Sequence, residues 1–209
     1  MRHVEIQLHH KPVKYIVVRN WLPPEQHSRI LDYVTQEVEY DPGLYGNPNG
    51  ESLYTQVKLN HNQWLTPPNA VASEIQRACW SPEIDQACRD MDDLLFRAHR
   101  LNNLGSFLVS KYLEGDYFRW HADHTHYLTL NYVVKAADEG GVFELALETE
   151  DSRLPQDQLA DMLHTAVEIP NEDNCLIIFP AMHYHRVTSV RKGSRHTVQY
   201  FLSREFPKT

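Results

Sequence analysis

Two histidine-rich segments carry the residues best able to do chemistry in this chain. The first, HADHTH, spans residues 121–126, and the second, HYH, spans residues 183–185. On an extended segment, side chains two positions apart share a face, so His121 and Asp123 can point at a common centre while Ala122 points away. An imidazole beside a carboxylate provides two of the three ligands of the facial triad that holds non-haem Fe(II). By itself, the pattern is also what two solvated turn residues would give.

The second segment offers a third ligand. His183 and His185 share a strand face directly after the apolar run CLIIFP, which is typical of a buried strand. A buried strand that ends in histidine would bring a ligand into a barrel. We expect His185 to be that ligand and His183 to be structural or exposed.

An arginine follows at a useful distance. Arg195 lies ten residues after His185, beyond a Lys192-Gly193 turn and at the start of the last expected strand. A guanidinium binds a carboxylate through two parallel hydrogen bonds. An arginine held beside an iron site is therefore suited to a dicarboxylate co-substrate.

A rival set of ligands exists. His124 and His126 also stand two positions apart, and together with His185 they would form a three-histidine site. Such a site suits zinc and predicts a cupin-like hydrolase or isomerase. It would leave the Asp123 carboxylate unused, which argues against it. A second alternative is a non-catalytic jelly-roll binding protein whose histidines simply lie in strands.

Composition narrows the classes of partner that this chain could bind. The chain has 209 residues, with 20 Lys and Arg against 28 Asp and Glu, which gives a net charge of −8. Nucleic-acid binding depends on clustered Lys and Arg, so we expect no nucleic-acid partner. The 42% apolar and 23% charged residues are typical of a globular domain.

The cysteines and apolar runs predict a cytoplasmic protein. Cys79, Cys88 and Cys175 are odd in number and have no CxxC spacing, so neither a disulfide framework nor a zinc knuckle is indicated. The N-terminus has no apolar signal region, and the longest apolar run, Leu176 to Phe179, is too short to cross a membrane. We expect no membrane partner.

The first half of the chain is expected to support the site. Residues 13–18 predict a strand, and residues 24–38 and 82–100 predict helices from apolar side chains three or four apart. Between them, residues 41–69 are rich in Gly, Pro and Asn around one short strand at 53–59. This segment predicts either a mobile lid over the barrel mouth or a plain surface hairpin.

The second half is rich in short strands. FLVSKYL, YLTLNYVV, GVFELAL, AVEIP, CLIIFP, HRVTSV and HTVQYFL alternate with Gly, Asp and Pro, which favours an antiparallel barrel or jelly roll. One excursion, RLPQDQLADMLHTA, predicts a short inserted helix. We therefore expect one α+β domain over residues 1–209. In it, residues 1–104 form a helical support and lid region, and residues 105–209 form the jelly-roll core.

The motifs, taken in order, resemble the Fe(II)/2-oxoglutarate-dependent dioxygenases. YLEGDYFRWHAD, LTLNYVV, EGGVFEL and FPAMHYHRVTSVRKGSRHTVQYFL are similar to the core of that family. The prolyl 4-hydroxylase-like branch, with its Y-x-x-G…H-x-D…G-G…H…R layout, is the most similar. The leading strand and the LPPEQHSRILDYV helix also resemble this branch, so the similarity spans most of the chain. It implies a double-stranded β-helix, a jelly-roll barrel flanked by helices.

The resemblance assigns a role to each matching position. It implies that His121, Asp123 and His185 ligate Fe(II) and that Arg195 binds the distal carboxylate of 2-oxoglutarate. Tyr112 matches the tyrosine that donates its hydroxyl to the same carboxylate, and its alternative is a buried core tyrosine.

Further residues complete the expected pocket. Thr197 shares a strand face with Arg195 and could add a hydroxyl donor. Asn131 is expected to face inward, and Gly140-Gly141 matches the turn before the next barrel strand. Candidate walls of a substrate pocket are aromatic: Trp64, Phe118, Trp120 and Tyr127.

The resemblance also implies a reaction. Fe(II), 2-oxoglutarate and O₂ would hydroxylate an unactivated C–H bond with release of succinate and CO₂, with ascorbate as an optional reductant. The substrate would be an amino-acid side chain of the prolyl type, peptidyl or free, or a small metabolite. The oligomeric state stays open.

Overall fold

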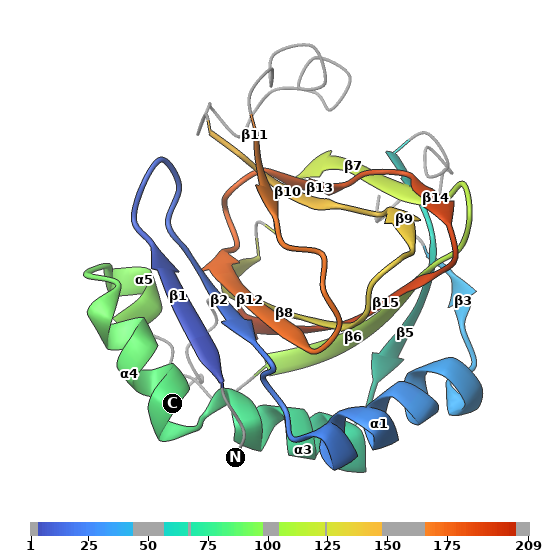
Figure 1. Ribbon diagram of the computed structural model, residues 1–209, viewed down its shortest axis with the longest axis horizontal. Coiled ribbons are helices and arrows are strands. Elements are labelled where there is room, and N and C mark those ends of the chain that lie inside the picture. Colours follow the sequence, from blue (N-terminus) through green and yellow to red (C-terminus); the bar gives the residue numbers. More distant parts are fainter. Residues whose placement is uncertain are drawn as a thin grey trace.

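Two antiparallel sheets face each other, and the helices lie outside the larger sheet (Figure 1). This computed structural model describes residues 4–43, 57–66, 68–97, 105–123, 125–147 and 166–203. No helix within these ranges is long and apolar enough to cross a bilayer. The α+β class and the jelly-roll barrel expected from the sequence are confirmed.

The larger sheet carries one wall of the barrel. Within the described ranges, its strand order is β1-β2-β12-β8-β15-β6-β5-β3. The bounds are β1 (Glu5–His9), β2 (Tyr15–Arg19), β12 (Cys175–Pro180), β8 (His126–Lys135), β15 (Arg195–Ser203), β6 (Gly105–Tyr112), β5 (His61–Leu65) and β3 (Asp41–Pro42).

The smaller sheet carries the opposite wall, in the order β11-β10-β13-β7-β4. Its strands are β11 (Ala166–Ile169), β10 (Phe143–Ala146), β13 (His185–Val187), β7 (Tyr117–His121) and β4 (Lys58–Leu59). A two-stranded ribbon of β9 (Glu139–Gly140) and β14 (Val190–Lys192) closes one end. Gly140 and Gly141 make the expected turn, with φ of 73° and 61°, a backbone conformation that favours glycine.

Alternation along the strands builds two cores. In β2, Ile16 and Val18 face the helices, whereas Tyr15 and Val17 face the barrel interior. All residues of β12 are buried, because its two faces meet different cores. This explains why CLIIFP is apolar throughout and not only at every second position.

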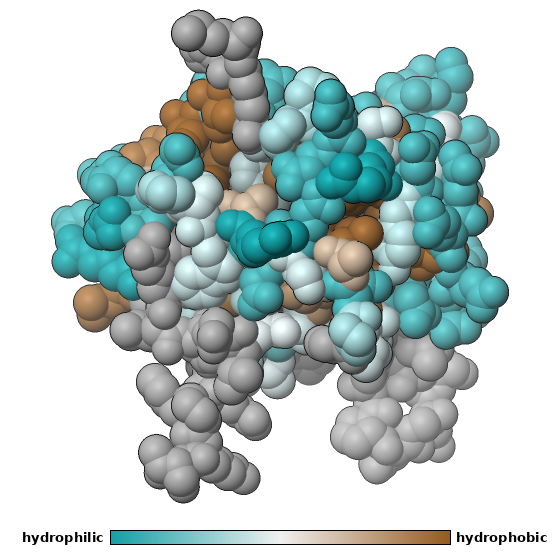
Figure 2. Space-filling view, turned by 90° about the horizontal axis from the view of Figure 1, so that it is seen from below, coloured by the Kyte–Doolittle hydropathy of each residue, from teal (hydrophilic) through white to brown (hydrophobic). Residues whose placement is uncertain are grey.

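The helices cover the outer face of the larger sheet. They are α1 (Pro24–Asp32), α3 (Ala70–Cys79), α4 (Pro82–Asp90) and α5 (Leu94–Arg97). Their apolar faces bury Ile30, Ile75 and Ile84 against the sheet. Seen from below (Figure 2), the molecule is mostly hydrophilic, and apolar side chains show in patches between the polar ones.

The strand expected at 13–18 is confirmed as β2, and the helix expected at 24–38 is present but changes form. The α-helix ends at Asp32, and Tyr33–Glu37 continues as a π-helical turn, η1. Thr35 Oγ1 donates to the Leu31 carbonyl at 2.7 Å. A hydroxyl that binds a carbonyl within a helix competes with the regular backbone bonds and often bends the helix.

The expectation of one helix over 82–100 is wrong. It is broken after Asp90, because Asp92 takes a left-handed conformation with φ of 48°. The Asp93 carboxylate then accepts from Leu95 N at 2.9 Å at the start of α5. Residues 98–100 lie outside the described ranges.

Several elements were not expected from the sequence, and one of them, helix α3, left a signal there. Helix α3 begins after Asn69, whose side chain accepts from Ala72 N at 2.9 Å, a standard N-cap. The apolar spacing of Val71, Ile75 and Cys79 also fits a helix. Strand β1 was missed as well.

The lid interpretation of residues 41–69 is corrected in part. Residues 61–65 are not a loose covering but form β5, which pairs with β6 from His61–Lys111 to Leu65–Phe107. Of the strand expected at 53–59, residues 58–59 form β4. Residues 44–56 lie outside the described ranges, as does most of the helix expected at 153–166.

Candidate active site

The candidate site is a cavity of about 500 Å³ between the two sheets. This volume is typical of small-molecule sites. The charged or titratable side chains on its wall are Lys58, His121, Asp123, His126, His185 and Arg195, besides the Tyr112 phenol. Every residue in the expected Fe(II) and co-substrate set except Thr197 lines this one space.

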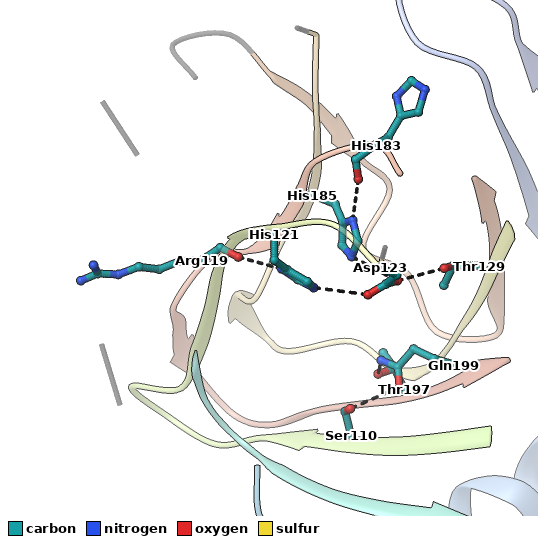
Figure 3. A network of polar contacts seen from close by, with 9 residues as sticks. All are labelled: Ser110, Arg119, His121, Asp123, Thr129, His183, His185, Thr197 and Gln199. Carbon is teal, nitrogen blue, oxygen red and sulfur yellow. Dashed lines mark hydrogen bonds and ion pairs between the residues drawn. The ribbon is translucent and has the colours of Figure 1, made fainter. Parts of the chain in front are cut away.

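Three candidate metal ligands converge at one end. His121 ends β7 and His185 begins β13, and the two residues are paired directly across these strands. One ligand atom each from His121, Asp123 and His185 lies within 4.8 Å of the other two. The Asp123 carboxylate oxygens lie 4.0 Å from His121 Nε2 and 3.7 Å from His185 Nε2 (Figure 3).

Hydrogen bonds orient each of these side chains. His121 Nδ1 lies 2.8 Å from the Arg119 carbonyl, and His185 Nδ1 lies 2.8 Å from the His183 carbonyl. With the proton on Nδ1, both Nε2 lone pairs face the carboxylate. Thr129 Oγ1 donates to Asp123 Oδ2 at 3.0 Å. Two imidazoles and one carboxylate, each held by a further group, fit a divalent iron ion with open positions.

The other histidines considered as ligands are not shown in this group. The His183 side chain points away from the cluster, and only its carbonyl takes part (Figure 3). His126 stacks on Phe201 with ring centroids 4.8 Å apart. His124 lies outside the described ranges. Among the described residues, His121, Asp123 and His185 are the only group of His, Cys, Asp and Glu close enough to hold a metal.

Arg195 lines the same cavity from β15 of the larger sheet, whereas His121 and His185 lie on strands of the smaller one. Its side chain is fully buried, and within the described part of the chain neither Nη1 nor Nη2 has a hydrogen-bond partner. Nε donates weakly to Asn171 Oδ1 at 3.4 Å. Burial lowers the pKa of Arg195 to about 10, so the guanidinium stays charged at neutral pH. A buried cation with two unpaired donor groups on a cavity wall fits a carboxylate ligand.

Tyr112 stands beside that guanidinium. The two residues pair across β6 and β15, and Arg195 Cζ lies 5.8 Å from the Tyr112 ring centroid. Burial raises the pKa of Tyr112 to about 12, although Arg195 and a hydrogen bond with Asn60 act in the opposite direction. The phenol therefore stays protonated and can donate. Tyr112 both packs in the barrel core and lines the cavity.

Thr197 is buried behind the cavity wall and does not line it. Its Oγ1 accepts from Gln199 Nε2 at 2.7 Å, and Ser110 Oγ donates to Gln199 Oε1 at 3.2 Å (Figure 3). Gln199, which the sequence analysis missed, stands on the wall instead. Asn131 does face inward, and its Oδ1 is buried without a partner within the described ranges.

The aromatic candidates divide into two pairs. Phe118 and Trp64 line the cavity, and Phe118 stacks on His121 with centroids 3.4 Å apart. Trp120 and Tyr127 do not line it and instead pack in hydrophobic clusters. Lys58 and Thr129 on the wall were also missed. Neither has a sequence signal, because only strand pairing brings them there.

Comparison with known proteins agrees with this geometry. Residues 107–203 match the model of the 2OG-Fe(II) oxygenase superfamily, a range that runs from β6 to β15 and contains every candidate site residue except Lys58 and Trp64. The match is confined to these barrel strands, and it indicates that the protein is an oxygenase that uses Fe(II), 2-oxoglutarate and O₂. A sequence comparison with curated proteins finds no match.

Solved structures share the fold over nearly the whole chain. A prolyl-4-hydroxylase from Pseudomonas putida superposes with a TM-score of 0.65 at 14% identity, over 93% of this chain and 94% of that one. A Trichoplax adhaerens prolyl hydroxylase, solved with a hypoxia inducible factor peptide fragment, gives 0.63 at 14% identity over 90% and 83%. A viral collagen prolyl hydroxylase from Paramecium Bursaria Chlorella virus-1, solved with 2OG, gives 0.55 at 14% identity over 90% and 94%.

Proposed function

We propose that this oxygenase hydroxylates an unactivated C–H bond of an amino-acid side chain, peptidyl or free, or of a small metabolite, with release of succinate and CO₂. His121, Asp123 and His185 hold Fe(II). Arg195 and Tyr112 hold the distal carboxylate of 2-oxoglutarate. The observation that carries the proposal is the buried Arg195 guanidinium, whose two terminal nitrogens lack a partner among the described residues, in the same cavity as the His-Asp-His group.

Each residue has a separate task. The two imidazoles and the carboxylate would hold Fe(II), and a set of three protein ligands would leave positions open for 2-oxoglutarate and O₂. When bound, iron with its co-substrate supplies the oxidising power for C–H hydroxylation. Arg195 sets the orientation of the co-substrate through a forked pair of hydrogen bonds, and the Tyr112 phenol adds one donor. Thr197 contributes indirectly, because its hydroxyl accepts from Gln199 on the wall.

We also propose that residues 1–209 fold as one domain. Strands β1, β2, β3 and β5 from the first half extend the larger sheet, and β4 extends the smaller one. The helices of the first half share one hydrophobic cluster with β8, β12 and β15. The first half therefore completes the barrel and does not only support it.

The decisive test is spectroscopic. Fe(II) followed by 2-oxoglutarate is added anaerobically to the metal-free protein, and a weak visible charge-transfer band is expected. Zn(II) in place of Fe(II) should give no band, which serves as the control. No band with Fe(II) would overturn the proposal. Zinc retained at the site together with indifference to 2-oxoglutarate would favour a zinc hydrolase or isomerase.

A further inference from the structure

Lys58 brings a second cation into the cavity. It lies on β4, directly across from Phe118 on β7, and its side chain is only 6% exposed. Nζ lies 4.6 Å from the centroid of the Phe118 ring. The same ring stacks on His121. Lys58 and a candidate metal ligand thus contact the same aromatic ring.

This ammonium group has no carboxylate partner in the part of the chain that the structure describes. The polar contact of Lys58 is the side-chain amide of Asn62. In the orientation that satisfies the hydrogen-bond neighbours of this amide, the amide oxygen accepts from Lys58 Nζ at 2.6 Å. Burial lowers the pKa of Lys58 to about 8, and Asp123 is the charge that opposes this shift. A buried cation without an ion-pair partner is unfavourable, so Lys58 favours an anionic ligand.

The charges on the cavity wall do not balance without a further ligand. Among the described residues, the wall carries two side-chain cations, Lys58 and Arg195, and one carboxylate, Asp123. Fe(II) adds two positive charges, and 2-oxoglutarate adds two negative ones. Asp123 is then committed to the metal and Arg195 to the co-substrate, so one positive charge remains at Lys58. A poorly hydrated site of this kind favours a counter-charge on whatever binds next to it.

We propose that Lys58 binds a carboxylate of the primary substrate, so that the enzyme acts on a small carboxylate-bearing molecule such as a free or N-acylated amino acid. The interior of an uncharged peptide would leave the lysine unpaired. This inference rests on the proposed function, because it assigns Asp123 to the metal and Arg195 to the co-substrate.

The wall of the cavity suits the rest of such a molecule. Phe201 lies between two other rings, with centroids 6.0 Å from Trp64 and 4.8 Å from His126. All three line the cavity, and Trp64 is 52% exposed. An apolar body can therefore pack on this aromatic row while its carboxylate pairs with Lys58.

The test compares acids with their amides. The protein is loaded anaerobically with Fe(II) and 2-oxoglutarate and titrated with N-acetyl-L-proline, benzoate and hexanoate, and with N-acetyl-L-prolinamide, benzamide and hexanamide. Binding is followed by the shift of the charge-transfer band. At least one acid should bind at least tenfold more tightly than its amide, and the charge-transfer band should remain when it binds. Lys58→Met should reduce that preference to about twofold or less, and Lys58→Arg should keep it.

A matched control separates this role from a general loss of charge. Lys111 also lies over an aromatic ring, with Nζ 5.5 Å from the Tyr40 centroid, but it does not line the cavity. Lys111→Met should therefore preserve the preference for the acid. The affinity of Lys58→Met for 2-oxoglutarate should be within about threefold of the wild-type value, because Arg195 and not Lys58 binds the co-substrate.

Several results would overturn the proposal. In the wild type, these are equal binding of every acid and its amide, no binding of any acid, or an acid that only removes the band by displacing 2-oxoglutarate. In Lys58→Met, an unchanged preference or a parallel loss of 2-oxoglutarate affinity would do the same. The wild-type comparison stands even if the variant does not fold. If the band never forms, the proposed function itself is wrong, and this inference fails with it.

Discussion

The two ends of the cavity differ in how far the chain itself satisfies their polar groups. At the end formed by β7 and β13, the His121 and His185 rings bond to carbonyls, and the Asp123 carboxylate accepts from Thr129. At the end formed by β6 and β15, both terminal nitrogens of Arg195 lack a partner within the described ranges.

This difference separates two tasks, the orientation of the metal ligands and the affinity for the co-substrate. The His-Asp-His end is oriented before anything binds, as first-row metal sites require. A buried charged group without partners is unfavourable, so the Arg195 end is completed only by a ligand. Changes at the first end should damage the metal site, whereas changes at the second should weaken co-substrate binding and leave the metal alone.

The largest effect is expected at the carboxylate. Asp123→Ala should abolish turnover even if some iron still binds, a loss of at least about a thousandfold, because the metal contributes several kcal/mol to the reaction. Succinate release from 2-oxoglutarate measures this. Asp90→Ala, at an exposed position of α4, is the control and should keep full activity. Appreciable turnover in Asp123→Ala would remove this residue from the site.

The next effect tests the other end of the cavity. Arg195→Ala should weaken 2-oxoglutarate binding by on the order of a hundredfold, since charge-assisted hydrogen bonds contribute roughly 1.5–3 kcal/mol each. Iron affinity should change by no more than about twofold. Arg195→Lys should bind 2-oxoglutarate with an affinity between those of wild type and Arg195→Ala. The lysine ammonium keeps the charge attraction but cannot make the two parallel hydrogen bonds of a guanidinium. Anaerobic titration of the charge-transfer band measures both ligands, and an unchanged 2-oxoglutarate affinity would contradict the comparison.

A smaller effect is expected behind the metal site. Thr129→Val removes the hydroxyl that donates to Asp123 and keeps the side-chain shape. Iron affinity should fall about tenfold, as is typical when a group that orients a ligand is lost. Thr129→Ser should restore it. Competition with a chelator gives the affinity. An unaffected iron affinity in Thr129→Val would mean that Asp123 is oriented by other contacts.

The smallest effect is expected at His183. Its carbonyl, not its imidazole, holds His185, so His183→Ala should leave iron affinity and turnover within about twofold of wild type. His185→Ala should lose tight iron binding. Metal analysis of both variants after dialysis checks this. The reverse pattern would show that the third ligand had been misassigned by two positions.

Local patterns in the sequence account for much of the site. Strand alternation predicts that His121 and Asp123 share a face, and the buried run before His185 predicts an inward ligand. Both predictions follow from periodicity and polarity, which nearby residues determine. Most strands of the second half were predicted for the same reason, although β7 was not. Helix α3 was also encoded locally, by its N-cap and apolar spacing, although it was missed.

Other features depend on contacts between distant segments. Lys58 reaches the cavity because β4 pairs with β7, and Arg195 stands beside Tyr112 because β15 pairs with β6. Residues 61–65 resemble a loop in composition, yet the edge of β6 makes them a strand. Thr197 shares a face with Arg195, yet its hydroxyl accepts from Gln199 and the residue does not line the cavity. The sequence alone thus determined which residue types could bind iron and a dicarboxylate. Only the tertiary structure decided which of them meet, because strand pairing and burial join residues far apart in the chain.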